Sequence, residues 1–363
     1  CIGKWHLGMD ITRRQGATDT DAPIQNGPTT NGFDHFYGVT ASLDMPPYVF
    51  VEDDRFAAPL TDRIARRGFP SYWREGEIAE GFVHRDALDH LTDHARAYIH
   101  ERAEGDAPFF LYLPLTSPHK PTLPAERFTG QSGLGPYGDF VIQTDDVVGR
   151  IDQALRDAGV FDNTLVIVTS DNGSYMFRRA PDEPDHTDDA GVQGYHPDAH
   201  TANGELRGTK ADIYEAGHRV YFAARWPGVI EAGSVADQAV SLVDVFATLA
   251  DLLGEPLPDD AAEDSYSMLG LLHGEASDHE RGAVVMHSAN GMFAIRQGRW
   301  KLIAGDGSGG REQPRGTPFA KPYQLYDLEA DLSERHDVAG DHPDVVAELE
   351  ALLQQYREEG RSR

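Results

Sequence analysis

The sequence lacks or is poor in three features, and each shortage narrows its possible classes. Cys1 is the only cysteine, so no intrachain disulfide can form. No run of about 18 apolar residues occurs, so no segment has the length and character of a membrane-spanning helix. Basic residues are few, because 32 Lys and Arg face 60 Asp and Glu, which gives a net charge of −28. So acidic a chain is a poor non-specific binder of nucleic acid or of an anionic membrane surface.

The regular pattern of the sequence predicts an α/β fold. The 363 residues are 40% hydrophobic, which is ample for a buried core in one large domain or two. A strand rich in apolar residues and an amphipathic helix alternate along the first part of the chain, as in a mostly parallel central sheet flanked by helices. The expected helices span residues 86–102, 140–158 and 241–253, and the expected strands span 108–113, 164–169 and 219–225.

The pattern changes after a Pro- and Asp-rich stretch at residues 255–265. Short strands at close spacing over 283–287, 292–297 and 300–303 indicate an antiparallel sheet, and a helix over 345–356 closes the chain. We therefore predict an α/β domain over residues 1–258 and a small antiparallel α+β subdomain over 259–363. Residues 177–208 show no periodicity, and they fit a functional loop and a flexible acidic insertion equally well.

The polar residues Asp171 and Asn172 directly follow the predicted strand 164–169. In an open α/β sheet, ligand sites lie just beyond the carboxyl ends of the strands. A carboxylate and an amide oxygen at such a point are hard oxygen ligands that suit a divalent cation. Asp-Asn-Gly is also a common turn sequence, and taken alone the turn is the better interpretation.

Other polar segments of the sequence favour a functional site over a simple turn at Asp171 and Asn172. Lys4 and His6 lie two residues apart in GKWHLG and therefore share one side of an extended stretch. His119 follows the predicted strand 108–113, and Lys210 lies in RGTK, ahead of YEAGHR. A cation with two lysines can hold a tetrahedral oxyanion, and a pair of histidines can transfer protons near neutral pH. A single Lys or His is more often a surface group, so the argument depends on the combination.

Four segments in this order, GKWHLG, SPHKP, SDNG and GTK followed by YEAGHR and RWPG, resemble the sulfatase family, the arylsulfatase branch of the alkaline-phosphatase-like superfamily. The segments GRWKLI and LYDLEADLSERHDVA are similar to the small C-terminal subdomain of sulfatases. The resemblance runs from the first residue to about residue 340. It implies a hydrolase of sulfate esters, with a sulfated small molecule or a sulfated glycan as substrate and a periplasmic or extracellular location.

The resemblance also implies roles for individual residues. Asp171 and Asn172 would be two ligands of Ca²⁺, and Lys4 and Lys210 would bind sulfate oxygens. His119 would protonate the leaving alcohol oxygen, and His6 would assist the nucleophile. Ser42 aligns with a serine that supports the surroundings of the nucleophile, and Glu215, Arg219 and the turn 226–228 would be architectural. A sulfated glycan would need a locally basic cleft, for which the candidates are His200, His186, His196 and His218.

The sequence departs from the family pattern at the nucleophile. Sulfatases use a formylglycine made from a C/S-x-P/A-x-R motif, and no such motif occurs among these residues. The paired aspartates that complete the family's metal site are also missing. We expect both upstream of GKWHLG, and we expect residues 1–363 alone to be inactive on sulfate esters. Two alternatives stay open: a phosphate or phosphonate monoester hydrolase of the same superfamily, and a non-catalytic homologue that binds polyanions.

Overall fold

The computed structural model describes residues 1–275 and 281–363. The chain folds into two units, Cys1–Phe161 with Arg179–Ala199 and Asp162–Arg178 with His200–Arg363, and each is described by itself. Of the helices in the described residues, none has both the length and the apolar character needed to cross a membrane. The domain boundary expected at residues 258 and 259 falls within the second unit and stays a prediction.

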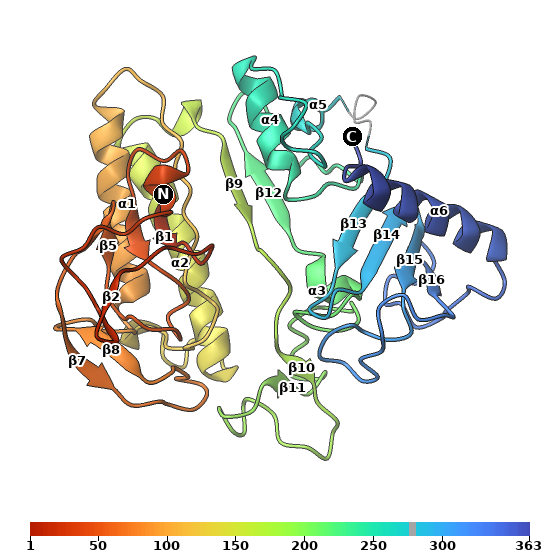
Figure 1. Cartoon of the computed structure of the whole chain (residues 1–363), viewed down its shortest axis with the longest axis horizontal. Helices are drawn as coiled ribbons and strands as arrows, with labels where there is room; N and C mark the ends of the chain where they lie inside the picture. Colours follow the sequence, from red (N-terminus) through yellow and green to blue (C-terminus); the bar gives the residue numbers. More distant parts are fainter. Residues whose placement is uncertain (276–280) are drawn as a thin grey trace. The chain divides into compact units, whose positions relative to one another are not determined.

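The first unit pairs a small mixed sheet with two long helices (Figure 1). The sheet has the strand order β1-β4-β5-β6, in which β1 and β4 are parallel and the other pairs antiparallel. The elements are β1 (Ile2–Lys4), β2 (Arg13–Arg14), β3 (Ala17–Thr18), η1 (Pro28–Thr30), β4 (Tyr37–Val39), β5 (Val51–Glu52), β6 (Arg55–Phe56), β7 (Leu60–Ile64), β8 (Gly76–Ala79), α1 (Ala87–Ala103), η2 (Glu126–Phe128), α2 (Gly135–Asp157) and β11 (Gly194–Tyr195). The short helix η3 (Phe161–Asn163) begins with the last residue of the segment Cys1–Phe161 and continues into the second unit.

Helix α1 confirms the helix predicted over residues 86–102. Its buried face carries Leu88, Leu91, Ala95 and Ile99, spaced three or four residues apart as an amphipathic helix requires. Asp86 precedes the helix but makes no side-chain capping hydrogen bond. Helix α2 begins at residue 135, five residues before the predicted start at 140, and its C-terminus is followed by Gly159 with a φ of 72°.

The buried strand predicted over residues 108–113 is wrong as stated. The segment is extended and runs beside β1. The Ile2 N–H donates to the carbonyl of Tyr112 (2.9 Å), and the Lys4 N–H donates to the carbonyl of Pro114 (2.8 Å). It is not assigned as a strand, and the side chains of Phe110 and Tyr112 are exposed. Leu111 and Leu113 on the opposite side pack into the core. The apolar run therefore has one buried side rather than two.

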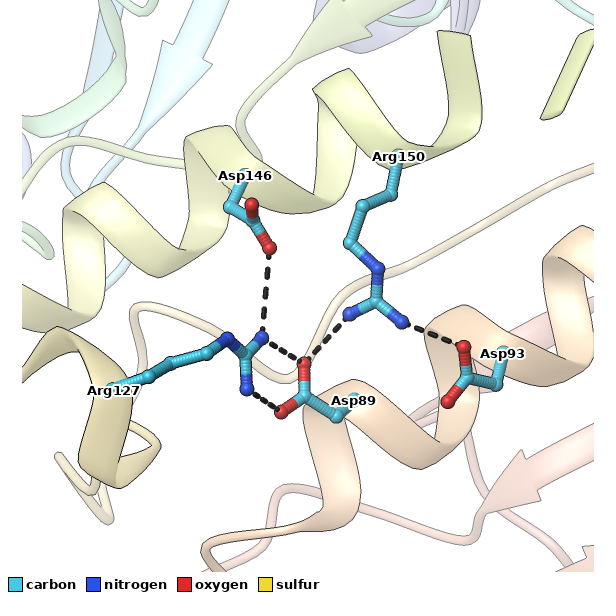
Figure 2. A pocket seen from close by; sticks show the side chains of 5 residues that line it. All are labelled: Asp89, Asp93, Arg127, Asp146 and Arg150. Carbon is cyan, nitrogen blue, oxygen red and sulfur yellow. Dashed lines mark hydrogen bonds and ion pairs between the residues drawn. The ribbon is translucent and has the colours of Figure 1, made fainter. Parts of the chain in front are cut away.

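A network of ion pairs joins α1, η2 and α2 at the surface (Figure 2). The guanidinium of Arg127 holds both carboxylate oxygens of Asp89 at 2.6 and 2.7 Å, and hydrogen bonding to Arg127 lowers the pKa of Asp89. Arg150 bridges Asp89 (2.7 Å) and Asp93 (2.6 Å), and Asp146 lies 3.5 Å from Arg127. The two arginines compensate most of the charge of the three carboxylates, so we interpret the hollow as a structural ion-pair network that joins these elements.

His84 lies in an aromatic cluster of the first unit and is 9% exposed. Its ring stacks on Trp73, with a centroid distance of 4.6 Å and an interplanar angle of 18°, and the Tyr48 ring lies at the same distance. Burial lowers the pKa of His84 to about 4, because the charged imidazolium would lose its hydration. In the unfolded chain the same group has a pKa near 6.5, so the unfolded state binds the proton first as the pH falls.

We therefore predict that His84 destabilises the protein as the pH falls from about 6.5 toward about 4, and has no such effect above about pH 7. The expected loss is about 2 kcal/mol between neutral pH and pH 4.5. Urea unfolding at both pH values, followed by tryptophan fluorescence, measures it. The variant His84→Phe keeps an aromatic ring but cannot titrate, so it should lose less stability than the wild type over this interval. Equal losses in the two proteins would contradict the prediction.

The second unit contains the antiparallel sheet and helices of the C-terminal half (Figure 1). The predicted strands at 283–287, 292–297 and 300–303 are confirmed, and a fourth strand, β16, was not predicted. Strand β9 pairs antiparallel with β12, and the sheet of the first unit joins one parallel pair to two antiparallel pairs, so the sheets are mixed and not mostly parallel as predicted. The elements are β9 (Val166–Thr169), β10 (Phe177–Arg178), α3 (Glu215–His218), β12 (Phe222–Arg225), α4 (Asp244–Leu253), α5 (Leu269–Leu272), β13 (Val284–His287), β14 (Phe293–Gln297), β15 (Trp300–Ala304), β16 (Gln324–Asp327) and α6 (Pro343–Glu359).

Helix α6 covers one face of the antiparallel sheet. Its Leu349 and Leu353 are buried against Ile295 of β14 and Leu302 of β15 in one apolar cluster. Helix α4 ends where the sequence predicted, because Gly254 adopts a left-handed conformation with a φ of 69°. The α/β class with a small antiparallel C-terminal subdomain is thus confirmed.

Candidate active site

Strand β1 positions Lys4 and His6 in the first unit. It lies between β4, with which it is parallel, and the extended backbone of residues 112–114. Gly3 is required there, since a Cβ on it would lie 2.2 Å from the carbonyl oxygen of Pro114. Gly3 therefore lets three segments of the chain pack side by side: β1, β4 and residues 112–114. Lys4 is the last residue of β1, and His6 follows just beyond it.

His6 and Ser42 are in contact. The Nδ1 atom of His6 lies 3.0 Å from the Oγ atom of Ser42, and the His6 N–H donates to the carbonyl of Thr40 at 3.1 Å. Ser42 is buried, whereas His6 is exposed. The φ of His6 is 55°, a left-handed conformation that is unusual for a histidine and costs on the order of 1 kcal/mol or more. The contact brings together two residues that the family resemblance placed separately around the nucleophile, and their roles stay predictions.

His119 lies beside an acid that the sequence analysis missed, Asp44. The Nδ1 atom of His119 donates to the carbonyl of Lys120 at 2.7 Å, so Nδ1 carries a proton. The same atom lies 4.0 Å from Oδ1 of Asp44. The Asp44 side chain is 4% exposed, and its Oδ1 has no hydrogen-bond donor among the described residues. The Asp44 carboxylate is thus a buried acid beside His119 that can restrain the position of its ring.

In the second unit, Asp171 and Asn172 follow β9, as predicted. Gly173 is packed against α3: a Cβ on it would lie 1.7 Å from the carbonyl of Ala216, and its N–H donates to the carbonyl of Gly217 at 3.2 Å. The Lys210 N–H donates to the carbonyl of Ser174 at 3.0 Å, which brings the RGTK segment next to SDNG.

The side chains of Asp171 and Asn172 fit a hard cation. Asp171 is exposed and Asn172 is partly exposed. In residues 1–275 and 281–363, no hydrogen bond or ion pair is made by the Asp171 carboxylate or by the Asn172 side-chain amide. Two oxygens without protein donors at a strand end are suitable as part of a Ca²⁺ ligand set.

Glu215 is the centre of a buried ion cluster that involves the C-terminal motifs. Lys301 of GRWKLI lies 2.9 Å from Glu215 and 2.8 Å from Glu334 of LYDLEADLSERHDVA, and all three side chains are at most 2% exposed. Arg219 adds a contact to Glu215 at 3.2 Å. Burial by itself would raise the pKa of Glu215, but Lys301 and His218 outweigh it and lower that pKa. The architectural role expected of Glu215 and Arg219 agrees with this arrangement.

The histidines proposed for a basic cleft have different environments. His186 is buried, accepts a hydrogen bond from Tyr137 N at 3.2 Å, and has a pKa lowered by burial. Burial likewise lowers the pKa of His218, beside Glu215. These two are therefore neutral, structural groups near pH 7, and their assignment to a basic cleft is wrong. His200 is partly buried and its role stays a prediction.

His196 belongs to a small acidic group with Asp185 and Asp188, whose ligand atoms lie within 4.8 Å of one another. Burial alone would raise the pKa of Asp185, but hydrogen bonds from Thr187, Asp188 and His196 bring it to about 2. The oxygens of Asp185 are thus already occupied by donors of its own loop. These hydrogen bonds help to fix the loop around Asp185, and the role of His196 stays a prediction.

The predicted site residues fall into two groups. The first unit carries Lys4, His6, Ser42 and His119, and the second carries Asp171, Asn172, Lys210 and His200. Within the first unit His6 contacts Ser42, and within the second unit the Lys210 backbone contacts the SDNG segment. Convergence of the two groups in one pocket stays a prediction.

The fold and these strand-end polar groups define an α/β protein of the alkaline-phosphatase-like class. A family model described as Sulfatase matches residues 1–255, and a second, described as N-sulphoglucosamine sulphohydrolase, C-terminal, matches residues 209–359. The chain belongs to the sulfatase family, whose members are sulfuric ester hydrolases.

Individual relatives agree with this assignment. The chain is 33% identical to an N-acetylgalactosamine-6-O-sulfatase of Bacteroides thetaiotaomicron, over 97% of the chain and 73% of that protein. It is 28% identical to the N-acetylgalactosamine-6-sulfatase of Mus musculus, over 92% of the chain but only 58% of the mouse protein. A solved structure from work on the metabolism of multiple glycosaminoglycans by B. thetaiotaomicron has a TM-score of 0.81 and 31% identity, and covers 98% of this chain and 78% of its own.

Proposed function

We propose that this protein hydrolyses sulfate esters of sulfated glycans, and that its substrates carry a 6-sulfated N-acetylgalactosamine or a similar amino sugar. The sulfatase family assignment supports the proposed reaction, and the similarity to N-acetylgalactosamine-6-sulfatases supports the proposed substrate class. Each unit has polar groups at a strand end, Lys4 and His6 after β1 in the first and Asp171 and Asn172 after β9 in the second, and groups of these types suit binding of a tetrahedral anion and a cation.

Each predicted site residue would have a separate role in the reaction. Lys4 and Lys210 would bind sulfate oxygens by charge-assisted hydrogen bonds. His119, with its Nδ1 proton on the Lys120 carbonyl and Asp44 at 4.0 Å, would donate the other ring proton to the leaving alcohol oxygen. Asp44 would act through His119 as a positioning residue. His6, held by Ser42 at 3.0 Å, would exchange a proton with the nucleophile.

Asp171 and Asn172 would hold Ca²⁺, which would supply positive charge to the sulfate oxygens. The nucleophile would be a formylglycine. Because these 363 residues contain no C/S-x-P/A-x-R motif, we place it in chain upstream of residue 1. A periplasmic or extracellular location, as in the family, is part of the same proposal.

One comparison of proteins and substrates tests this proposal. Residues 1–363 and a version extended upstream are assayed with an aryl sulfate and with the matching aryl phosphate, with Ca²⁺ and with a chelator. We expect activity in the extended version only, a preference for the sulfate, and loss of activity with the chelator. A preference for the phosphate would favour the monoester hydrolase. Equal activity of the two versions would place the nucleophile within these residues, and binding without turnover in both would favour a polyanion-binding homologue.

A further inference from the structure

The chain has a strongly basic segment close to His119. Between Arg63 and Arg74, four of twelve residues are arginine and none is acidic, in a chain whose net charge is −28. Of these arginines, Arg63 pairs with Glu75 at 3.6 Å and Arg74 approaches Asp44 at 3.9 Å. Arg66 and Arg67 are exposed, and neither has an ion pair among the described residues. This segment of an acidic protein therefore carries two arginines whose charge is not balanced by an ion pair with a described acid.

Aromatic rings hold the cations of this segment in place. The guanidinium of Arg66 and the ammonium of Lys120 both lie over the ring of Tyr72, at 5.8 and 4.1 Å from its centroid. The guanidinium of Arg67 lies over Trp73 at 5.1 Å. Each such contact stabilises the cation by about 0.5–1 kcal/mol at an exposed site and restricts its movement. Two cations at one ring repel each other, and an anion that contacts both would lessen that repulsion.

Backbone hydrogen bonds fix this segment beside His119. The Thr122 N–H donates to the carbonyl of Pro70 at 2.8 Å, and the Arg74 N–H donates to the carbonyl of Asp44 at 3.0 Å. The Trp73 indole N–H donates to the carbonyl of Ala65 at 2.9 Å, which closes the loop on itself. The segment is therefore built into the first unit, and Lys120 is the residue next to the proposed proton donor.

We infer that Arg66, Arg67 and Lys120 form a subsite for a second anionic group of the substrate, a sulfate or carboxylate on a sugar next to the one that loses its sulfate. The inference rests on the proposed function, since His119 would face the leaving sugar rather than the transferred sulfate. Arginine donates two parallel hydrogen bonds to a carboxylate or sulfate, and its held position reduces the entropy lost on binding. The net charge of −28 would repel a long polyanion such as DNA, whereas a local cluster suits a short anionic glycan.

The inference is tested by measuring substrate binding to residues 1–363 by calorimetry. The probes are 6-sulfated N-acetylgalactosamine and a tetrasaccharide in which that sugar alternates with a uronate. The variant Arg66→Ala/Arg67→Ala should raise the Kd of the tetrasaccharide roughly tenfold and that of the monosaccharide less than about twofold. The matched control Arg96→Ala/Arg102→Ala removes the same charge from α1 of the same unit, where both arginines are already paired with acids. It should change neither Kd by more than about twofold.

Three outcomes would overturn the inference. One is a tetrasaccharide Kd that the Arg66→Ala/Arg67→Ala variant leaves unchanged, and another is an equal effect of the control variant. The third is a DNA oligonucleotide of equal charge that binds as tightly and loses the same factor, because the cluster would then be a general polyanion patch. Lys120→Gln, as a second variant, should act in the same direction as the double variant. If Lys210→Ala leaves the monosaccharide Kd unchanged, the proposed function fails instead, independently of the subsite.

Discussion

Replacing Asp171 by alanine is expected to lower kcat for sulfate-ester hydrolysis at least about a thousandfold and to leave the melting temperature nearly unchanged. The carboxylate is exposed and makes no ion pair within the described residues, so the fold does not depend on it. Its loss would remove a ligand of the cation that stabilises charge on the sulfate. Sulfate release by the upstream-extended enzyme, together with its bound calcium by atomic emission, measures both effects.

Asp237→Ala is the matched control for this variant, because Asp237 is an exposed aspartate of the same unit that lies outside the proposed site. It should retain both turnover and calcium. An Asp171→Ala enzyme that keeps its calcium and turns over within about tenfold of the wild type would show that Asp171 is not a metal ligand.

The second large effect is expected at Lys301, whose replacement by methionine should destabilise the protein by about 3–5 kcal/mol. Lys301 is 0% exposed and lies between Glu215 (2.9 Å) and Glu334 (2.8 Å), so its loss leaves two buried carboxylates facing each other. The free energy of unfolding in urea measures the effect. The difference from the wild type should shrink as the pH falls toward about 4, because the carboxylates then become protonated and uncharged.

Lys321→Met provides the comparison for Lys301→Met. Lys321 also pairs with a glutamate at 2.9 Å, Glu350, but its side chain is 64% exposed. An exposed ion pair contributes about 0–1 kcal/mol, so this variant should be close to the wild type. Similar losses in the two variants would mean that the buried cluster does not hold the C-terminal motifs to α3.

The sequence predicted the elements whose signal is local. Helix α1 follows from apolar residues three and four apart, and the end of α4 follows from Gly254, which can adopt a left-handed conformation. Strand pairing depends on residues far apart in the chain, so the antiparallel pairing of β9 with β12 could not be inferred. The strand β16 was missed because its apolar residues Leu325 and Tyr326 are adjacent in QLYD and do not alternate with polar ones.

In the candidate site, too, the sequence predicted what depends on local motifs and missed what depends on contacts between distant residues. The resemblance of whole motifs located His6, Ser42 and the SDNG segment. His6 contacts Ser42, the SDNG backbone contacts Lys210, and the roles of these residues stay predictions. Asp44 and the segment from Arg63 to Arg74 were missed, because their significance lies in their distance from residues 119 and 120, which only a folded chain reveals. His186 was misread for the same reason, since burial, which sequence does not report, makes it neutral.

The most direct test of the central claim is the release of inorganic sulfate from a 6-sulfated N-acetylgalactosamine oligosaccharide by the upstream-extended protein. Ion chromatography measures the sulfate, and the matching 6-phosphorylated sugar is assayed beside it. We predict that sulfate is released with kcat/KM at least about a hundredfold above that for phosphate, and that His119→Ala reduces it by at least that factor. Release of phosphate in preference to sulfate, or sulfate release that does not depend on His119, would contradict the account.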